Sequence, residues 1–135
     1  VLFSRPGLGV GFADETPLRP EHHPVYEMAG VGRDDVDGLY VYDSFSSNVW
    51  MTLERFGFCG EGEAPGWIAS HGLGVGAALP VNTNGGLLSE GHFGGYNHLV
   101  EMVRQLRGEC GPRQIAGAEV LQWTTPWGDS LIFTR

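Results

Sequence analysis

The chain has 135 residues, a length that suits one domain and allows roughly two thirds of the unfolded chain's surface to be buried. With a formal net charge of -8, the chain lacks the basic surface that binding to a nucleic-acid backbone requires. No stretch approaches the roughly 18 to 20 consecutive apolar residues of a membrane span. All eight Lys/Arg side chains are arginine, so Schiff-base chemistry by a lysine amine is not available within this chain. We therefore expect a soluble protein that binds neither nucleic acid nor membrane.

Cysteine usage and the first residue add two expectations. Cys59 and Cys110 are too few for a disulfide scaffold and form no metal-ligand pattern, so we expect a reducing, cytoplasmic environment and no metal site. The chain begins on Val1, and its first residues already have the character of a buried strand. We expect a fragment or one half of a larger protein.

The first elements expected in chain order are a strand, a loop and a helix. VLFSRPGLGVGF predicts a short strand that turns at Pro6 and Gly7, and the polar, proline-bearing residues 13–20 predict a loop. EHHPVYEMAG then predicts a short helix, because Pro24 is accepted in a first turn and Gly30 favours a stop.

A strand, a helix and a glycine-rich segment follow. LYVYDSF is rich in aromatic and β-branched residues and predicts a strand. The next segment predicts a helix capped by Ser46, Ser47 or Asn48. Its apolar face is expected to consist of Val49, Trp50, Leu53 and Phe56. Residues 57–78, GFCGEGEAPGWIASHGLGVGAA, predict an irregular excursion without regular secondary structure.

The last part of the chain predicts three strands and a helix. LPVNT indicates a short strand, and EVLQWT and SLIFTR indicate two final strands joined by a TPWG turn, with Pro126 second and Gly128 fourth. A helix that ends at Gly108 is predicted by an apolar stripe at i, i+3, i+4 and i+7, formed by Leu99, Met102, Val103 and Leu106. This alternation predicts an α/β fold over residues 1–135, with a mixed, mostly parallel sheet of about five strands and helices on its faces.

His92 is the first candidate for chemistry. Gly91, Gly94 and Gly95 allow the backbone to approach a ligand closely, and a predicted helix begins shortly afterwards. A histidine in this position can act as a general base or face a developing negative charge. The alternative is a histidine that only forms hydrogen bonds within a glycine-rich turn.

Tyr42 and Asp43 end a predicted strand, at the carboxyl edge where α/β proteins place many of their sites. The Tyr42 hydroxyl can donate a hydrogen bond to an oxyanion or move a proton. The alternatives are a half-buried strand tyrosine and an aspartate that caps the following turn.

The cysteines favour structural or incidental roles. A nucleophilic Cys59 needs a lowered thiol pKa, and its acidic neighbours act in the opposite direction. Cys110 lies in the polar turn GECGPR, which offers no activating partner.

The remaining histidines and two tryptophans also favour structural interpretations. His22, His23 and His71 lack partners at metal-ligand spacing, so we expect them at the surface. Trp123 and Trp127 are expected in core and loop packing, and Trp127 at a hairpin tip can also line a pocket.

Four separate motifs, DVDGLYVYDSF, LERFGFCGEGE, LPVNTNGGLLSEGH and LVEMVRQLRGE, resemble the C-terminal half of the thiolase superfamily in their order and spacing. They are most similar to the bacterial non-specific lipid-transfer, or sterol-carrier-protein-type, thiolases, and the resemblance extends from about Ala29 onward. It implies a subunit of two similar α/β halves, with the nucleophilic cysteine in the N-terminal half. It also implies a coenzyme A thioester as substrate in lipid metabolism, no separate cofactor, and a homodimer.

The resemblance implies roles for particular residues. His92 in SEGH matches the Gly-His motif, which implies a catalytic histidine at the substrate carbonyl or in the oxyanion hole. Tyr42 falls where thiolases have asparagine or histidine and lipid-transfer members have tyrosine, which implies contact with the same oxyanion or a proton transfer. The residues expected to bind substrate are Asn82, Gly85, Gly86, Gly91, Trp127 and Gly128.

Two departures from the thiolase pattern leave the reaction open. The final turn TTPWGD lacks the second, acid–base cysteine of degradative and biosynthetic thiolases, and Phe93 replaces the usual proline. GGYNHLVEMVRQLRGE is also similar to the steroid side-chain CoA aldolases, which cleave a β-hydroxyacyl-CoA and often work with an OB-fold, zinc-ribbon partner. Thiolase-type acyl transfer is the first expectation, retro-aldol cleavage the second, and a non-catalytic lipid-transfer or scaffolding subunit the third.

Overall fold

A computed structural model describes residues 24–135. Its strands are β1 (Gly38–Val41), β2 (Val120–Thr124) and β3 (Ser130–Thr134). Its α-helices are α1 (Pro24–Ala29), α2 (Ser47–Arg55), α3 (Ala64–His71), α4 (Leu87–Glu90) and α5 (Tyr96–Arg107), and its short 3-10 helices are η2 (Arg33–Asp35) and η3 (Gly111–Arg113). The strand predicted from VLFSRPGLGVGF with its turn at Pro6 and Gly7, the loop 13–20 and the first residues of the first predicted helix lie outside the described residues.

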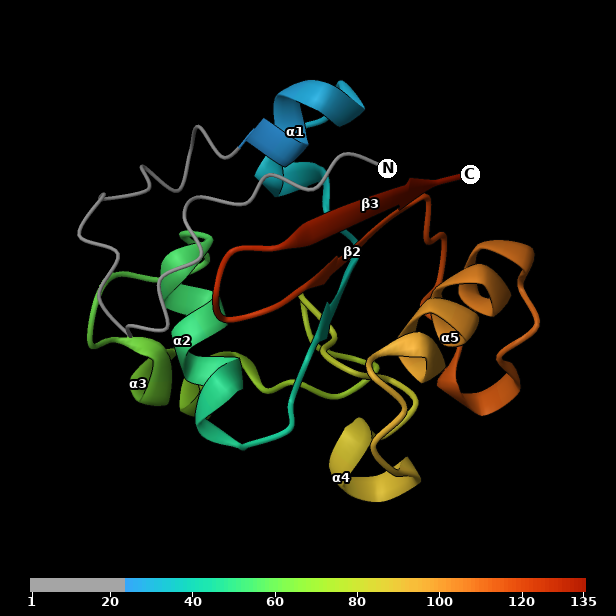
Figure 1. The fold of residues 1–135 in the computed structure, drawn as a ribbon. Coiled ribbons are helices and arrows are strands. Elements are labelled where there is room, and N and C mark those ends of the chain that lie inside the picture. The colour runs from blue at the N-terminus through green and yellow to red at the C-terminus, as the bar shows by residue number, and fades with distance from the viewer. Residues whose placement is uncertain (1–23) are drawn as a thin grey trace.

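The three strands form one mixed sheet in the order β1-β2-β3 (Figure 1). β1 and β2 are parallel and reach their carboxyl ends together, with Val41 opposite Thr124, whereas β2 and β3 are antiparallel. The Gly128 N–H donates to the Thr125 carbonyl at 3.1 Å and closes the turn between β2 and β3. The two final strands and the TPWG turn predicted from the sequence are therefore confirmed.

The described residues contain three strands, so the prediction of about five is wrong for this part of the chain. LPVNT, predicted as a strand, makes only an isolated parallel bridge between Val81 and Leu39 of β1. Pro80 has no N–H for a ladder, and Asn82 has a φ of +48°, in the left-handed region, so regular pairing does not extend along this segment. β1 is also shorter than LYVYDSF predicts, because it ends at Val41.

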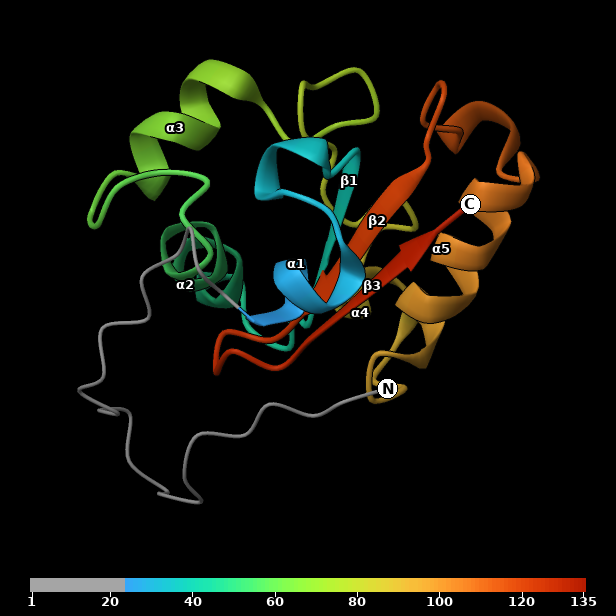
Figure 2. The ribbon, with the colours of Figure 1, turned by 90° about the horizontal axis from the view of Figure 1, so that it is seen from above.

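Helices cover both faces of the sheet, with α1, α2 and α3 on one face and α5 on the other (Figure 1, Figure 2). The side chains of β1 alternate between these two layers. Leu39 and Val41 belong to the hydrophobic cluster on the α2 side, and Tyr40 belongs to the cluster with Met102 of α5. All four residues of β1 are buried, as is typical of a parallel strand covered on both faces.

α2 and α5 confirm two of the predicted helices. Leu53 and Phe56 of the predicted α2 face are fully buried, but Trp50 is 49% exposed, so the prediction is wrong for that side chain. α5 stops before Gly108, whose φ of +73° gives the left-handed cap that the sequence predicts. None of the helices between residues 24 and 135 is long and apolar enough to span a bilayer.

α3 corrects the prediction of an irregular segment at residues 57–78. The helix occupies Ala64–His71 and contains both Pro65, which suits a first helical turn, and Gly66. Trp67 and Ile68 pack against the hydrophobic cluster on the α2 side of the sheet, so tertiary contacts stabilise a helix that local propensity does not predict.

Candidate active site

Tyr42 and His92 are brought together from two loops. Tyr42 follows β1 directly, and His92 follows α4. The Tyr42 hydroxyl oxygen lies 2.9 Å from His92 Nε2, and the two ring centroids are 5.7 Å apart with the ring planes at 83°. Both predicted catalytic side chains thus form a hydrogen-bonded pair, and His92 is exposed to solvent.

A third loop reaches the same place. Trp127, in the turn between β2 and β3, is 51% exposed, and its ring centroid lies 6.1 Å from that of Tyr42. The loops after β1 and after β2 both start at the carboxyl end of the parallel strand pair. This edge is where side chains from separate loops meet in open α/β sheets.

The predicted substrate-binding residue Asn82 is engaged by the backbone of β1. Its Oδ1 accepts a hydrogen bond from the Val41 N–H at 2.8 Å, and its Nδ2 donates to the Val41 carbonyl at 3.1 Å. The side chain therefore continues the ladder that the irregular backbone interrupts. Asn82 fixes the start of its loop at the end of β1.

The glycines predicted to line the substrate pocket lie where the backbone conformation or a close neighbour excludes a larger side chain. Gly86 has a φ of +76° and a ψ of -179°, and a Cβ on it would overlap the Asp43 carboxylate. Gly91 has a φ of +126°, and its Cβ would lie 2.9 Å from the Phe93 ring. Gly85 also has a positive φ, so the loop from Asn82 to His92 relies on backbone shapes that other residues rarely adopt.

The Asp43 carboxylate, for which a cap of the following turn was the alternative interpretation, accepts a hydrogen bond from a distant segment of the chain. Its Oδ1 accepts a hydrogen bond at 2.8 Å from the N–H of Leu87, the first residue of α4. Burial alone raises the pKa of the Asp43 carboxyl, but hydrogen bonds from His98 and from the Leu87 backbone outweigh that effect and hold the pKa below its ordinary value. The carboxylate therefore joins the end of β1 to the loop that presents His92.

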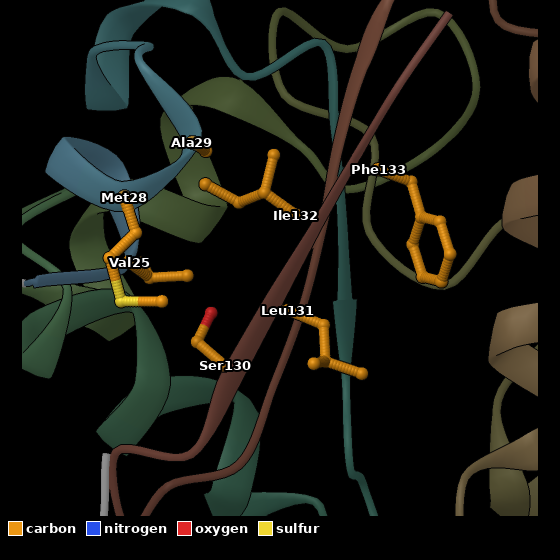
Figure 3. Close-up of a pocket in the computed structure, with 7 residues that line it drawn as sticks. All are labelled: Val25, Met28, Ala29, Ser130, Leu131, Ile132 and Phe133. Atoms are coloured by element: carbon orange, nitrogen blue, oxygen red, sulfur yellow. The ribbon is translucent and has the colours of Figure 1, made fainter. Parts of the chain in front are cut away.

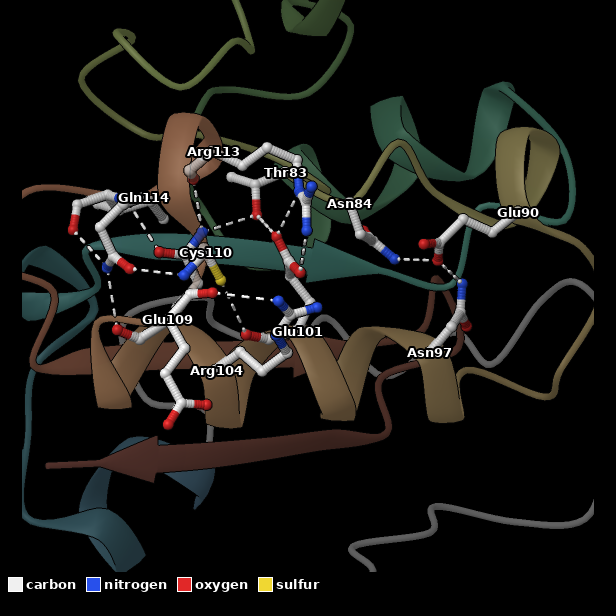
Figure 4. Close-up of polar contacts among 12 residues, drawn as sticks. Thr83, Asn84, Glu90, Asn97, Glu101, Arg104, Glu109, Cys110, Arg113 and Gln114 are labelled. Atoms are coloured by element: carbon white, nitrogen blue, oxygen red, sulfur yellow. Dashed lines mark hydrogen bonds and ion pairs between the residues drawn. The ribbon is translucent and has the colours of Figure 1, made fainter.

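The sequence analysis missed a second set of polar residues behind the site. His98 is fully buried, with Nε2 3.4 Å from Asp43 Oδ1 and Nδ1 3.3 Å from Asn84 Oδ1. The Asn84 amide donates to Glu90 at 2.6 Å, and the Asn97 amide donates to the same carboxylate oxygen at 2.8 Å (Figure 4). The available signal was the polar series at positions 98, 101 and 105, which shares a helix face with the apolar stripe of α5.

Glu101 is the centre of a neighbouring network on the same helix face. It accepts two hydrogen bonds from Arg113, each at 3.1 Å, and one from Thr83 at 3.0 Å (Figure 4). Thr83 in turn accepts from the Tyr40 hydroxyl and from the Gln105 amide. Burial raises the pKa of the Glu101 carboxyl, but the hydrogen bonds from Arg113 and Thr83 outweigh it, so the pKa lies below its ordinary value. This network anchors the residue that follows Asn82.

Neither cysteine has the environment of a nucleophile. Burial raises the pKa of the Cys59 thiol, and Glu54 and Glu63 raise it further. Burial and Glu101 likewise raise the pKa of the Cys110 thiol. Both thiols are free, and the prediction that acidic neighbours oppose activation of Cys59 is confirmed.

The pocket in Figure 3 lies away from these loops, between α1 and the edge strand β3. Its volume is about 210 Å³, and its lining residues are Val25, Met28, Ala29, Ser130, Leu131, Ile132 and Phe133. The lining contains one hydroxyl and no ionisable side chain, so it offers no acid–base chemistry.

His71, one of the histidines predicted at the surface, lies at the end of α3 and not on the loops that carry Tyr42 and His92. His71 is exposed, as predicted, and its ring stacks on Trp67 with centroids 4.5 Å apart. His22 and His23 lie outside the described residues. Within residues 24–135, no three His, Cys, Asp or Glu side chains gather as a potential metal site.

Comparison with known proteins shows a clear family relationship. Residues 15–125 match the family model described as "Thiolase C-terminal domain-like". A 17-hydroxy-3-oxo-4-pregnene-20-carboxyl-CoA lyase of Mycobacterium tuberculosis is 41% identical over 111 residues, which cover 75% of this chain and 28% of the relative. Sterol carrier protein 2 of Rattus norvegicus is 38% identical over 113 residues, which cover 81% of this chain and 21% of the relative.

A solved structure has the same fold in the matching region. The Ltp2-ChsH2(DUF35) aldolase superposes with a TM-score of 0.75 at 34% sequence identity, over 82% of this chain and 29% of that chain. This chain therefore spans less than a third of the length of each of these relatives. With the family model matching most of its length, the chain belongs to the thiolase C-terminal domain-like family.

Proposed function

We propose that this domain supplies part of the active site of an enzyme that cleaves a β-hydroxyacyl-CoA by a retro-aldol reaction. The observation that carries the proposal is the hydrogen-bonded pair of Tyr42 and His92, exposed at the carboxyl edge of the sheet. A tyrosine and a histidine at hydrogen-bonding distance suit proton transfer at a β-hydroxyl group, and two of the similar proteins are a lyase and an aldolase.

The reaction requires one proton to be removed and one to be returned. A base takes the proton of the β-hydroxyl group, the Cα–Cβ bond breaks to give a ketone or aldehyde, and the electron pair moves onto the thioester as an enolate. Protonation of Cα then gives the shortened acyl-CoA. In our assignment the Tyr42 oxygen accepts the hydroxyl proton while its own proton passes to His92 Nε2, 2.9 Å away, and the pair returns a proton afterwards. A positioned acid or base is typically worth about 10² to 10⁴-fold in rate.

The relatives support a sterol or other lipid acyl-CoA as the substrate class. One is a lyase of a steroid carboxyl-CoA and another is a sterol carrier protein. We propose that the N-terminal half of a thiolase fold, in the same or another chain, completes the site, and that the enzyme is a homodimer. The name of the similar solved structure, Ltp2-ChsH2(DUF35) aldolase, joins an aldolase with a DUF35 protein. This supports an accessory partner, in line with the OB-fold, zinc-ribbon protein that the resemblance implies.

A non-catalytic lipid-transfer role is the second candidate. Its support is the sterol carrier protein relative together with four exposed apolar side chains, three of them close in sequence to the candidate pair and the fourth in the turn between β2 and β3. These side chains are Phe45, Leu88, Phe93 and Trp127. A carrier needs the apolar surface but not the acid–base pair, so variants of the pair separate the two candidates.

The test is the His92→Ala variant in a protein with both halves of the thiolase fold. We expect at least a hundredfold loss of kcat with an unchanged circular dichroism spectrum, because the variant removes one member of the pair. His71→Ala is the matched control, because His71 is exposed on α3 and should leave turnover unchanged. Near-normal turnover by His92→Ala would overturn the assignment. A parent protein that shows no turnover, and that binds lipid as tightly as the His92→Ala variant does, would favour the carrier.

A further inference from the structure

The buried contact between Asp43 and His98 has no part in the proposed proton transfers. His98 is on α5, is fully buried, and faces Asp43 at 3.4 Å through a nitrogen that has no other hydrogen-bond partner among the described residues. A distance of 3.4 Å is long for a hydrogen bond, but it is short for two buried groups that can attract each other as ions. A buried polar group of this kind requires an explanation.

The neighbours of His98 determine where its protons lie. The Glu90 carboxylate can only accept, so the Asn84 Nδ2 group must point to it and Asn84 Oδ1 must face His98 Nδ1. Nδ1 therefore carries a proton. Nε2 faces Asp43 Oδ1, an oxygen that already accepts from the Leu87 N–H. Two acceptors on opposite sides of one ring fit an imidazolium paired with a carboxylate.

Asp43 links its contact with His98 to both candidate catalytic residues, Tyr42 and His92. It is the next residue after Tyr42, and it holds the first N–H of α4, the helix that ends two residues before His92. The other side of the same loop is tied down through Asn84 and Glu90. The pair thus joins the end of β1, the start of α4 and the first turn of α5.

We propose that Asp43 and His98 form an ionic positioning pair that keeps Tyr42 and His92 at hydrogen-bonding distance. Neither residue touches the reacting atoms in our assignment, so both act through the loops they hold. The kinetic part of this inference rests on the proposed function, whereas the structural part does not.

The structural test uses the full-length protein with isotope-labelled histidine and tyrosine. We expect nuclear Overhauser contacts between the Tyr42 and His92 rings in the parent protein, and their loss in Asp43→Asn and in His98→Gln. Leu106→Ala is the control, because Leu106 packs in the α5 cluster two turns from His98 and its truncation should destabilise the core without freeing the loops. Ring contacts kept in both pair variants, or lost equally in the control, would overturn the proposal.

The ring signals of His98 give a second readout, which reports its contact with Asp43 directly. We expect the two ring nitrogens of His98 to donate to Asn84 and to Asp43 in the parent protein, and the ring signals to shift in Asp43→Asn. A His98 ring with one bare nitrogen in the parent protein would contradict the ionic pair.

The kinetic test compares kcat with KM. We expect Asp43→Asn and His98→Gln each to lower kcat about tenfold to a hundredfold with KM nearly unchanged, and the double variant to lose little more than either single one, because the two residues act as a unit. Additive losses, or a rise in KM alone, would contradict the inference. A parent protein without turnover would defeat the proposed function but would leave the ring-contact result intact.

Discussion

The loops that carry Tyr42 and His92 are held by hydrogen bonds from two side chains to the backbone. Asn82 and Asp43 each place a side chain on the backbone of a distant segment, Val41 in one case and Leu87 in the other. The chain can make the second contact because Gly86 has no Cβ to meet the carboxylate. At the scale of single residues, the site is therefore built by backbone anchoring.

Gly86→Ala tests this anchoring. The φ of +76° with ψ of -179° is a region essentially restricted to glycine, and the new methyl group would also overlap Asp43. We expect a loss of about 1–3 kcal/mol in the free energy of unfolding, measured by urea titration, with loss of the Tyr42–His92 ring contact.

Gly66→Ala is the matched control for that substitution. Gly66 lies inside α3, and a Cβ on it would meet no atom within 4 Å. Because glycine is a poor helix former, we expect a gain of roughly 0.5–1 kcal/mol in stability and an intact ring contact. Equal losses in the two variants would contradict a special role for Gly86.

The elements show which parts of the fold can be read from the sequence. α5 and the β2–β3 hairpin were predictable because a 3.6-residue apolar stripe and two apolar runs around TPWG are local signals. α3 was not predictable, because Pro65 and Gly66 have low helix propensity and the helix is stabilised by tertiary packing. A strand at LPVNT was predicted, but only one isolated bridge forms, because Pro80 has no N–H and Asn82 has a left-handed conformation.

The candidate site also contains residues that were predictable from the sequence and residues that were not. Tyr42 and His92 were predictable as single residues, from a strand end, a glycine-rich loop and a family resemblance. Their support from Asp43 and His98 was not, because that contact joins residues 55 positions apart and no local pattern specifies it. The polar residues at positions 98, 101 and 105 of α5 are a sequence signal for a network, but they do not specify its partners.

The network of Glu101 on α5 predicts a pH-dependent stability. The folded-state pKa of this carboxyl is lowered, so its stabilisation is complete above the unfolded-state value and is lost as pH falls through the lower folded-state value. We expect Glu101→Gln to lose about 1.5–3 kcal/mol in urea unfolding at neutral pH, as for hydrogen bonds to a charged group, and to match the parent protein in acid.

Glu109→Gln is the control for this comparison, because Glu109 is exposed and no hydrogen bond of its carboxylate is seen among the described residues. It should follow the parent protein at every pH. A Glu101→Gln deficit that stays constant into acid would show that the carboxylate charge is not the source of the stability.

At the scale of the whole molecule, the chain corresponds to one part of its longer relatives. The chain covers 28% of the Mycobacterium tuberculosis lyase and 21% of the Rattus norvegicus sterol carrier protein 2. Exposed apolar side chains flank the candidate pair in the sequence. In the enzyme that we propose, the other half of the fold completes the site.

The most direct test of the proposed chemistry is product analysis by that complete protein on a β-hydroxyacyl-CoA, with and without free CoA. We predict release of a ketone or aldehyde and a shortened acyl-CoA without added CoA. We also predict at least a hundredfold slower release by Tyr42→Phe and no change for Tyr96→Phe, whose ring is 72% exposed on α5. Product formation that requires free CoA, or that survives Tyr42→Phe unchanged, would contradict the account.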